Sequence, residues 1–137
     1  MVDPEYPTAI DPARVGSYPA LAGAGGGYVW DEVLEYRVWC HPEDGSDDYF
    51  NAFATYPEAL AFARRTKQAE EPLVLIRQDE HISELEPGVF VHVMTPRLTE
   101  WPVEFLTRPK RTPSAIPEFL SPTASPNRLD ILRGISK

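Results

Sequence analysis

The side chains with the greatest chemical potential stand next to one another at Cys40 and His41, and a run of carboxylates follows them. A cysteine nucleophile needs a base within hydrogen-bond distance, but neighbouring residues of a strand point to opposite faces. Cys40 also continues a series of alternating apolar residues. We therefore expect Cys40 to be a small buried core residue.

The segment Glu43–Asp48 is the densest group of carboxylates in the chain. With His41 beside it, this segment is a candidate cation site, and hence a candidate centre for a metal-dependent hydrolase. Its spacing does not match an EF-hand loop, and turn chemistry at Asp44 explains it without a metal. The histidines at 41, 81 and 92 match no zinc pattern. We expect a solvated loop with no metal, or an acidic rim that faces a basic ligand.

A glycine-rich segment at residues 23–27 invites a phosphate-binding interpretation, because glycine amides can approach an anion closely. It lacks the lysine and the serine or threonine of a P-loop, and it precedes a predicted strand rather than a helix. We interpret this segment as a flexible entry to the first strand.

Basic residues gather in the tail at Arg108, Lys110 and Arg111, close in sequence to Trp101 and Phe105. Basic and aromatic groups together can bind nucleic acid. Three cations are a small footprint in a chain whose net charge is −8, so we predict no nucleic-acid partner. An acidic partner, or the chain's own acidic loop, matches these cations better.

Aromatic residues concentrate around the first predicted hairpin, and any that lie on its open face would join a ligand or partner surface. Our candidate surface combines such residues with the acidic and basic groups above, and we assign no catalytic or cofactor-binding residue. Its members are Trp39, His41, Asp44, Asp47, Asp48, Trp101, Arg108 and Arg111.

The elements that must position these groups form three parts of one domain. A head over residues 1–27 is rich in proline and glycine, so we expect it to be irregular and draped across the domain. A compact middle over residues 28–95 carries the periodic signals. In the tail, residues 96–137, repeated prolines argue against sheet interiors, yet interleaved large apolar residues predict an ordered strap, packed in cis or on a neighbouring subunit. A last short helix is predicted over residues 128–133.

Alternation from Leu34 to His41 predicts the first strand of the middle, with every second residue from Leu34 on one face. An Asp-Gly pair at residues 44–45 offers hairpin chemistry, so residues 48–54 form the returning strand. A helix then follows, because the residues just after this strand read as a capping box.

Short apolar runs at residues 73–78 and 89–94 predict two further strands, and His92 is expected on the exposed face of the second. The expected fold class is therefore α+β. A small antiparallel sheet in the order β-β-α-β-β carries one main helix on a face, and proline-rich arms flank it.

The composition bounds the class of protein and its location. A chain of 137 residues has the size of one domain, and its 42% hydrophobic residues are typical of a globular fold. One cysteine excludes an internal disulfide framework. No apolar stretch approaches the length of about 18 residues that a membrane span needs, and the first residues do not read as a secretory signal. We expect a cytoplasmic protein with no membrane partner.

Three segments also carry a resemblance to known proteins. They are GAGGGYVWDEVLEYRVWCHP at residues 23–42, EWPVEFL at residues 100–106 and NRLDILRG at residues 127–134. Over nearly its whole length the chain resembles a small group of proteobacterial proteins labelled GCN5-related N-acetyltransferases. The resemblance implies acetyl-CoA as the acyl donor and an amine as the acceptor. Under that activity Glu32 or Glu35 would be the candidate base, and Gly25 and Gly26 would contact a CoA phosphate.

No coherent catalytic set emerges from the residues themselves. The leading hypothesis is therefore a non-enzymatic binding or interaction module without a cofactor, whose partner is another protein or a second copy of the chain. The alternative is the acetyl-CoA-dependent N-acetyltransferase that the resemblance implies.

Overall fold

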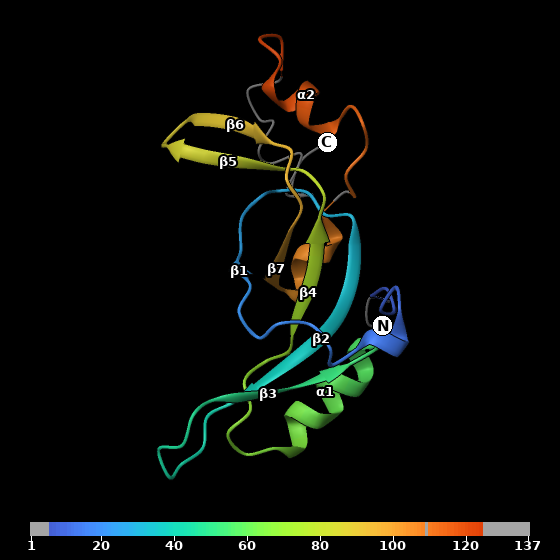
Figure 1. The fold of residues 1–137 in the computed structure, drawn as a ribbon, viewed down its shortest axis with the longest axis vertical. Helices are drawn as coiled ribbons and strands as arrows, with labels where there is room; N and C mark the ends of the chain where they lie inside the picture. The colour runs from blue at the N-terminus through green and yellow to red at the C-terminus, as the bar shows by residue number, and fades with distance from the viewer. Residues whose placement is uncertain (1–5, 109, 125–137) are drawn as a thin grey trace, which may run out of the picture.

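The computed structural model describes residues 6–108 and 110–124, and its largest element is a five-stranded mixed sheet (Figure 1). The strands of this sheet are β1 (Gly23–Ala24), β2 (Glu32–Cys40), β3 (Tyr49–Phe53), β4 (Leu73–Gln78) and β7 (Arg97–Pro102). Their order is β1-β7-β4-β2-β3, and all neighbours are antiparallel except β1 and β7, which run parallel.

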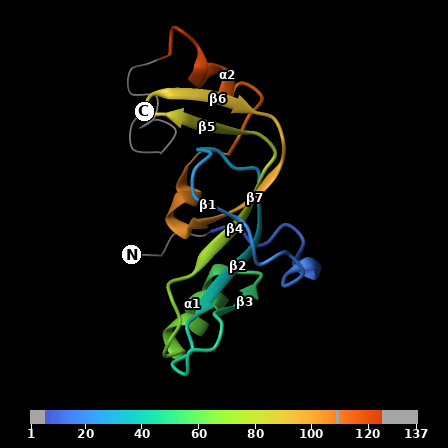
Figure 2. The same ribbon diagram turned by 60° about the vertical axis from the view of Figure 1, so that its left-hand side comes forward.

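A separate hairpin with a helix on it forms the upper end of the molecule in Figures 1 and 2. Its elements are β5 (His81–Glu86), β6 (Val89–Val93) and α2 (Ala115–Leu120). A small core of Val29, Ile82, Ile116 and Phe119 lies between the hairpin and α2. Because a two-stranded hairpin is at best marginally stable alone, this core is what holds it in place.

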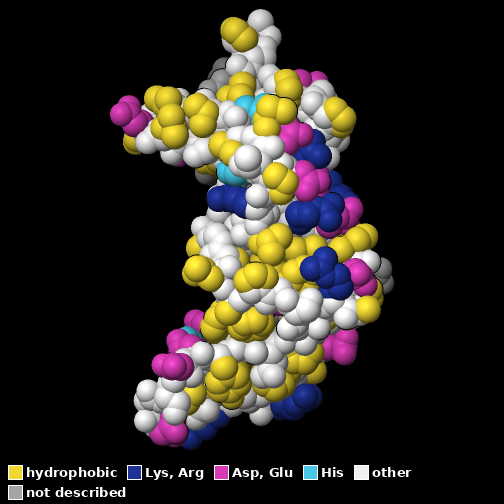
Figure 3. Space-filling model, in the orientation of Figure 1, with side chains coloured by type: hydrophobic (Ala, Val, Ile, Leu, Met, Phe, Trp, Pro, Cys, Tyr) yellow, Lys and Arg dark blue, Asp and Glu magenta, His cyan; other side chains and the backbone are white. Residues whose placement is uncertain are grey.

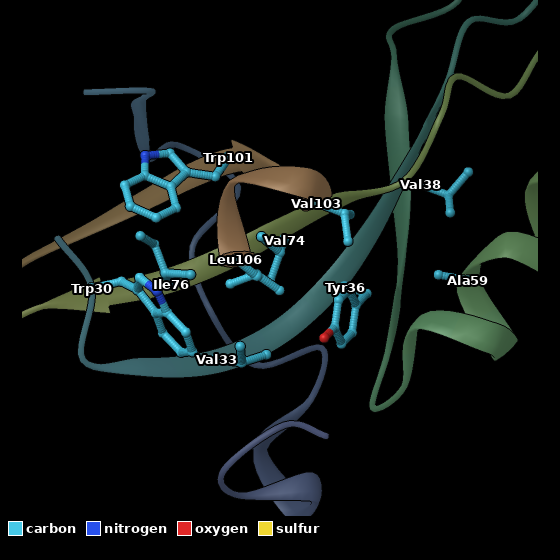
Figure 4. Packing of buried hydrophobic residues seen from close by; sticks show 10 residues of the cluster. All are labelled: Trp30, Val33, Tyr36, Val38, Ala59, Val74, Ile76, Trp101, Val103 and Leu106. Atoms are coloured by element: carbon cyan, nitrogen blue, oxygen red, sulfur yellow. The ribbon is translucent and has the colours of Figure 1, made fainter. Parts of the chain in front are cut away.

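The main hydrophobic core lies between the five-stranded sheet, α1 (Tyr56–Arg65) and the short 3-10 helix η2 (Val103–Thr107). The side chain of Thr55 accepts a hydrogen bond from the Glu58 amide, so α1 begins at the predicted capping box. The buried residues of this core, shown in Figure 4, are Trp30, Val33, Tyr36, Val38, Ala59, Val74, Ile76, Trp101, Val103 and Leu106.

A register shift between Val33 and Glu35 decides which side chains of β2 face this core. Val33 and Tyr36 both belong to the core cluster, although three positions separate them. Leu34 instead lies beside Arg77 on the opposite face of the sheet. The prediction that Leu34 shares a face with Tyr36 is therefore wrong, because one extra residue in the strand inverts the alternation before it.

The α+β class is confirmed, with two sheets and two α-helices in the part of the chain that the structure describes. The order β-β-α-β-β is incomplete, because β5 and β7 follow β4 and were not predicted. Only His81 and Ile82 of β5 are buried, so its sequence lacks the alternation of a half-buried strand. β7 has Pro96 just before it and Pro102 as its last residue, and these prolines led to the prediction that the tail stays out of the sheet.

The tail corrects a second prediction. Its prolines do not keep it out of the sheet interior, because β7 lies between β1 and β4. Pro102 is the last residue of that strand, where a missing amide donor costs little. Likewise Pro117 lies in the first turn of α2, where proline is tolerated. The described tail packs on its own chain, whereas the helix predicted over residues 128–133 lies outside the described residues.

The N-terminal segment of residues 6–22, here called the arm, runs past the end of β3 and continues onto the other face of the sheet. The Ala9 amide donates to the Ala54 carbonyl and the Ile10 amide to the Val33 carbonyl, each at 2.8 Å. The ring of Tyr6 packs edge-on against Tyr56 on the α1 side. The arm therefore touches both faces. Among the described residues, no helix is both long enough and apolar enough to cross a membrane.

Candidate functional site

The face of the sheet opposite α1 carries a buried ion pair at the centre of β2. Arg37 Nε lies 2.7 Å from Glu35 Oε2, and both side chains are completely buried. Residues i and i+2 of a strand share a face, so the strand itself sets this pair side by side. We call Glu35 and Arg37 the clamp.

The arm covers the clamp and binds it with backbone groups. The Gly16 amide donates to Glu35 Oε1 at 2.8 Å. On the other side, the Arg37 guanidinium donates to the carbonyls of Pro19 and Ala20. Both charges are therefore satisfied by the arm as well as by each other, which is the condition under which buried ions are tolerated.

The remaining contacts of Arg37 reach β7 and β3. Its Nη1 lies 3.2 Å from Glu100 Oε2, and the same oxygen accepts a hydrogen bond of 2.8 Å from Trp39 Nε1. The guanidinium lies over the ring of Phe50, 4.3 Å from its centroid. Trp39 was predicted as a surface residue, but its indole is half-buried and its only donor is already used.

The second site is the face of the β5–β6 hairpin that α2 leaves uncovered. Val89, Val91 and Val93 alternate along β6 on this face, whereas Phe90 packs edge-on against Phe119 of α2. We call the three valines the open face. Val89 is 45% exposed, and the apolar patch extends to Leu85 at 65% and Met94 at 70%. Figure 3 shows apolar side chains gathered along the hairpin.

One histidine of the hairpin does not lie as predicted. His92 was expected on the exposed face, but it shares the α2 side with Phe90, and its Nε2 lies 2.6 Å from Glu80 Oε1. His81 pairs with Val93 and is buried at the root of the hairpin. Burial and the nearby Arg97 guanidinium lower the pKa of His81, so this residue is neutral near pH 7.

His41 joins two loops at the other end of the sheet. Its Nδ1 lies 2.9 Å from Asp48 Oδ2, and its Nε2 lies 2.9 Å from Glu70 Oε2. Hydrogen bonds to Asp48 and Glu70 raise the pKa of His41 above its usual value. Both ring nitrogens are thus committed to carboxylates, so His41 does not serve as a base for Cys40. As predicted, Cys40 is buried.

The acidic loop behaves as a solvated turn. Asp44 and Asp47 are exposed, and Asp44 Oδ1 accepts the Ser46 amide at 2.9 Å. The Ser46 hydroxyl and then this amide bond lower the pKa of Asp44. Within residues 6–108 and 110–124, no three histidine, cysteine or acidic side chains are grouped so that they could hold a metal ion.

Trp101 is a correction to the predicted surface, because it is completely buried in the main core. Its indole nitrogen donates to the Gly26 carbonyl at 3.1 Å. Arg108 lies over the Phe105 ring at 3.6 Å, and over Trp101 at 5.4 Å. The interleaved prolines and apolar residues predicted a strap packed in cis or on a neighbouring subunit, and the strand β7 places this tryptophan in the core of its own chain.

Arg111 ties the hairpin to the main sheet. Its Nε lies 2.9 Å from Asp31 Oδ1, and its Nη1 lies 2.8 Å from Glu80 Oε2. Lys110 approaches Glu32 at 3.6 Å. Lys110 and Arg111 therefore do meet carboxylates of their own chain, but these are not the carboxylates of the Glu43–Asp48 loop.

The glycine-rich segment is bonded to its neighbours through carbonyls and through the Gly25 amide, which donates to the Glu100 carbonyl at 3.1 Å. The Gly26 carbonyl accepts hydrogen bonds from Gln78 and Trp101, and the Gly25 carbonyl accepts one from Arg97. Gly27 has a φ of +82°, and a Cβ there would overlap the Gln78 amide. These bonds serve the join between the two sheets.

The two glutamates considered as acetyl-transfer bases are both engaged. Glu35 is buried in the clamp, whereas Glu32 is half-buried and faces Lys110. The chain matches no known family model, no curated protein and no solved structure. The label of acetyltransferase therefore remains a resemblance at the level of the sequence alone.

Of the eight predicted site residues, the structure brings together His41 with Asp48, and Trp101 with Arg108. Sequence reasoning missed the clamp and the open face. A signal existed for each: opposite charges two residues apart inside an apolar strand, and three valines that alternate with larger residues along β6.

Proposed function

We propose that the protein is a non-enzymatic interaction module that binds a second copy of itself through the open face of its hairpin. The observation that supports this proposal most directly is the stripe of Val89, Val91 and Val93 on a sheet face that no described element covers. Exposed contiguous apolar patches on an acidic protein mark interaction surfaces rather than chance exposure.

A second copy is the favoured partner because the open face carries one carboxylate, Glu86, which pairs with Val89 at the tip of the hairpin, and is otherwise uncharged. Val91 is paired with Ser83, and Val93 with a histidine that is neutral near pH 7. Glu84, by contrast, pairs with Phe90 on the α2 side. An isologous contact needs this kind of self-complementary surface, and two β-branched faces stack well about a two-fold axis.

The expected affinity is modest. Full burial of a valine contributes about 1.5 kcal/mol or more, and these valines are already partly buried, so each adds roughly 1 kcal/mol. With Leu85 and Met94, ten side chains from two copies contribute about 10 kcal/mol, from which the cost of association removes about 4 kcal/mol or more. We therefore expect a dissociation constant on the order of tens of micromolar.

The proposal also places the module in the cytosol without a cofactor. Cys40, the single cysteine, is buried and unpaired, which suits a reducing compartment. His41 is held by two carboxylates, and the clamp glutamate by an arginine, so the titratable groups described above are engaged in structural contacts.

Sedimentation velocity from about 1 to about 200 µM tests the proposal, because a dimer of this affinity gains population across that range. Val89→Lys places a cation on the open face at an exposed position and should weaken the dimer by about 10-fold or more. Leu21→Lys, at an arm residue that is 91% exposed, is the matched control and should leave the dimer unchanged. A protein that stays monomeric throughout, or a Val89→Lys variant that dimerises normally, would show the proposal to be wrong.

A further inference from the structure

A pocket lies between the arm and the face of the sheet that carries the clamp, and neither the sequence patterns nor the proposed self-association assigns it a role. Its volume is about 440 Å³, within the usual range for small-molecule sites. The arm forms one wall with residues from Ile10 to Pro19. Leu34 of β2, Arg77 of β4 and Leu98 of β7 form the other.

The wall formed by the arm is fixed, so the pocket exists before any ligand arrives. The Ile10 amide is bound to the Val33 carbonyl at the start of this wall. Gly16 and Pro19, farther along, are bound to the two charges of the clamp. Since the clamp is buried, these bonds are shielded from water and keep the arm in register with the sheet. A preformed site avoids the entropy cost of ordering a loop on binding.

The floor of the pocket is apolar and its rim is cationic. Leu34 of β2 is buried, and Leu98 of β7 lines the same pocket from the far side of β4. Two guanidinium groups, Arg14 and Arg77, line the same cavity, with Asp11 as the only carboxylate among the lining residues. In a chain of net charge −8, the residues that line this pocket carry one more cation than carboxylate.

Arg14 is the cation best placed to receive an anion. Its guanidinium lies 4.8 Å from the centroid of the Tyr18 ring, and it forms no ion pair within the described part of the chain. Asp11, the nearest acidic residue in sequence, uses Oδ1 to accept the Ala13 amide. Arg77 is already paired through Nε with Asp79 at 2.8 Å. Arg14 therefore lines the pocket with a guanidinium that forms no ion pair among the described residues, next to an apolar floor.

We propose that this pocket binds a small carboxylate with an apolar body, and that Arg14 pairs with the carboxylate while Leu34 and Leu98 contact the body. A guanidinium binds a carboxylate through two parallel hydrogen bonds, which a neutral amide cannot reproduce. The ring of Tyr18 extends the apolar surface beside that charge. The flat body of an aromatic acid fits these features.

The probes for this proposal are 2-naphthoate and its neutral counterpart 2-naphthamide, which share one apolar body. Binding is followed in the full-length protein by the methyl resonances of Leu34 and Leu98, which report on the pocket itself. We expect 2-naphthoate to shift both residues and to bind about 10-fold more tightly than 2-naphthamide. Arg14→Gln should reduce the affinity for naphthoate to that for the amide.

Two further variants sharpen the test. Arg77→Gln should lower naphthoate affinity by less than Arg14→Gln does, because Asp79 already shares the charge of Arg77. Arg64→Gln removes an exposed arginine of α1 outside the pocket and should change nothing. Equal affinity for both probes, unchanged binding by Arg14→Gln, or no shift of the two leucines at millimolar probe would each overturn the proposal. None of these results depends on whether the hairpin dimerises.

Discussion

The clamp offers the sharpest test of the structure, because its two charges are buried and depend on each other. Replacing Glu35 by methionine removes two charge-assisted hydrogen bonds, from the Gly16 amide and from Arg37 Nε. Such bonds are worth about 1.5 kcal/mol or more each, so the loss of unfolding free energy should be about 3 kcal/mol. Arg37 would keep Glu100 as a partner, which limits the cost.

Arg37→Met should cost somewhat more, about 4 kcal/mol, because Glu35 is left buried with only the Gly16 amide as a partner. In the double variant no unpaired charge remains at either position. Its cost should then lie well below the sum of about 7 kcal/mol expected for independent sites, with a coupling of about 2 kcal/mol or more. The carbonyls of Pro19 and Ala20 and the Glu100 carboxylate lose a donor, and the Gly16 amide loses its acceptor.

Urea unfolding followed by tryptophan fluorescence measures these values, since Trp30 and Trp101 are buried in the main core. Cleavage by trypsin after Arg14 gives a second readout, because the arm should be released in both single variants. Lys67→Met, at an exposed pair 3.6 Å from Glu43, is a control that should leave unfolding unchanged. Costs that simply add in the double variant would refute the reasoning that the two charges compensate each other.

Two further predictions concern a turn and a histidine. In urea unfolding, Gly27→Ala should lower the free energy of unfolding by about 2 kcal/mol more than Gly45→Ala does. Both glycines have a φ of +82°, but only Gly27 has no room for a Cβ. Equal losses in the two variants would contradict the packing described at the join between the sheets. His41 has a raised pKa in the folded state, so its ion pairs with Asp48 and Glu70 stabilise the protein fully below the unfolded pKa of 6.5 and lose effect as the pH rises above it. The urea midpoint of the wild type relative to His41→Gln should therefore be higher at about pH 5.5 than at about pH 8, and a constant difference would exclude this role.

The predicted strands and helix were found where local signals agree with burial. The capping box at Thr55 and the apolar run at residues 73–78 each place an element correctly, because a cap and a buried strand are local properties of the chain. β7 was missed since it is recognisable only by its partners, β4 and β1, which lie far away in sequence. Pairing of that range is set by the whole sheet and leaves no local pattern.

The functional surfaces show the same division. Cys40 was correctly predicted to be buried, because alternation determines its face. His92 was predicted on the exposed face, but it lies on the side of the hairpin that α2 covers. Trp101 was predicted on the surface, but it is buried against the glycine-rich segment. Likewise, the strand pattern alone does not show that Glu35 is buried, because the arm that bonds to it lies elsewhere in the sequence. Residues far apart in sequence decided each of these cases.

The parallel pairing of β1 with β7 has a consequence for the order in which the chain assembles. Gly23 is paired with Thr99, so the edge of the sheet closes only after the segment that ends at Pro102 has been synthesised. Closing a loop of this length is slow compared with forming the hairpin of β2 and β3. During synthesis on the ribosome, the ion pair between Arg37 and Glu100 therefore forms only after β7 has emerged. Until then the hydrophobic strand β4 has β2 as a neighbour but lacks β7 on its other side. A chain truncated before β7 would present that unpaired strand to chaperones and proteases.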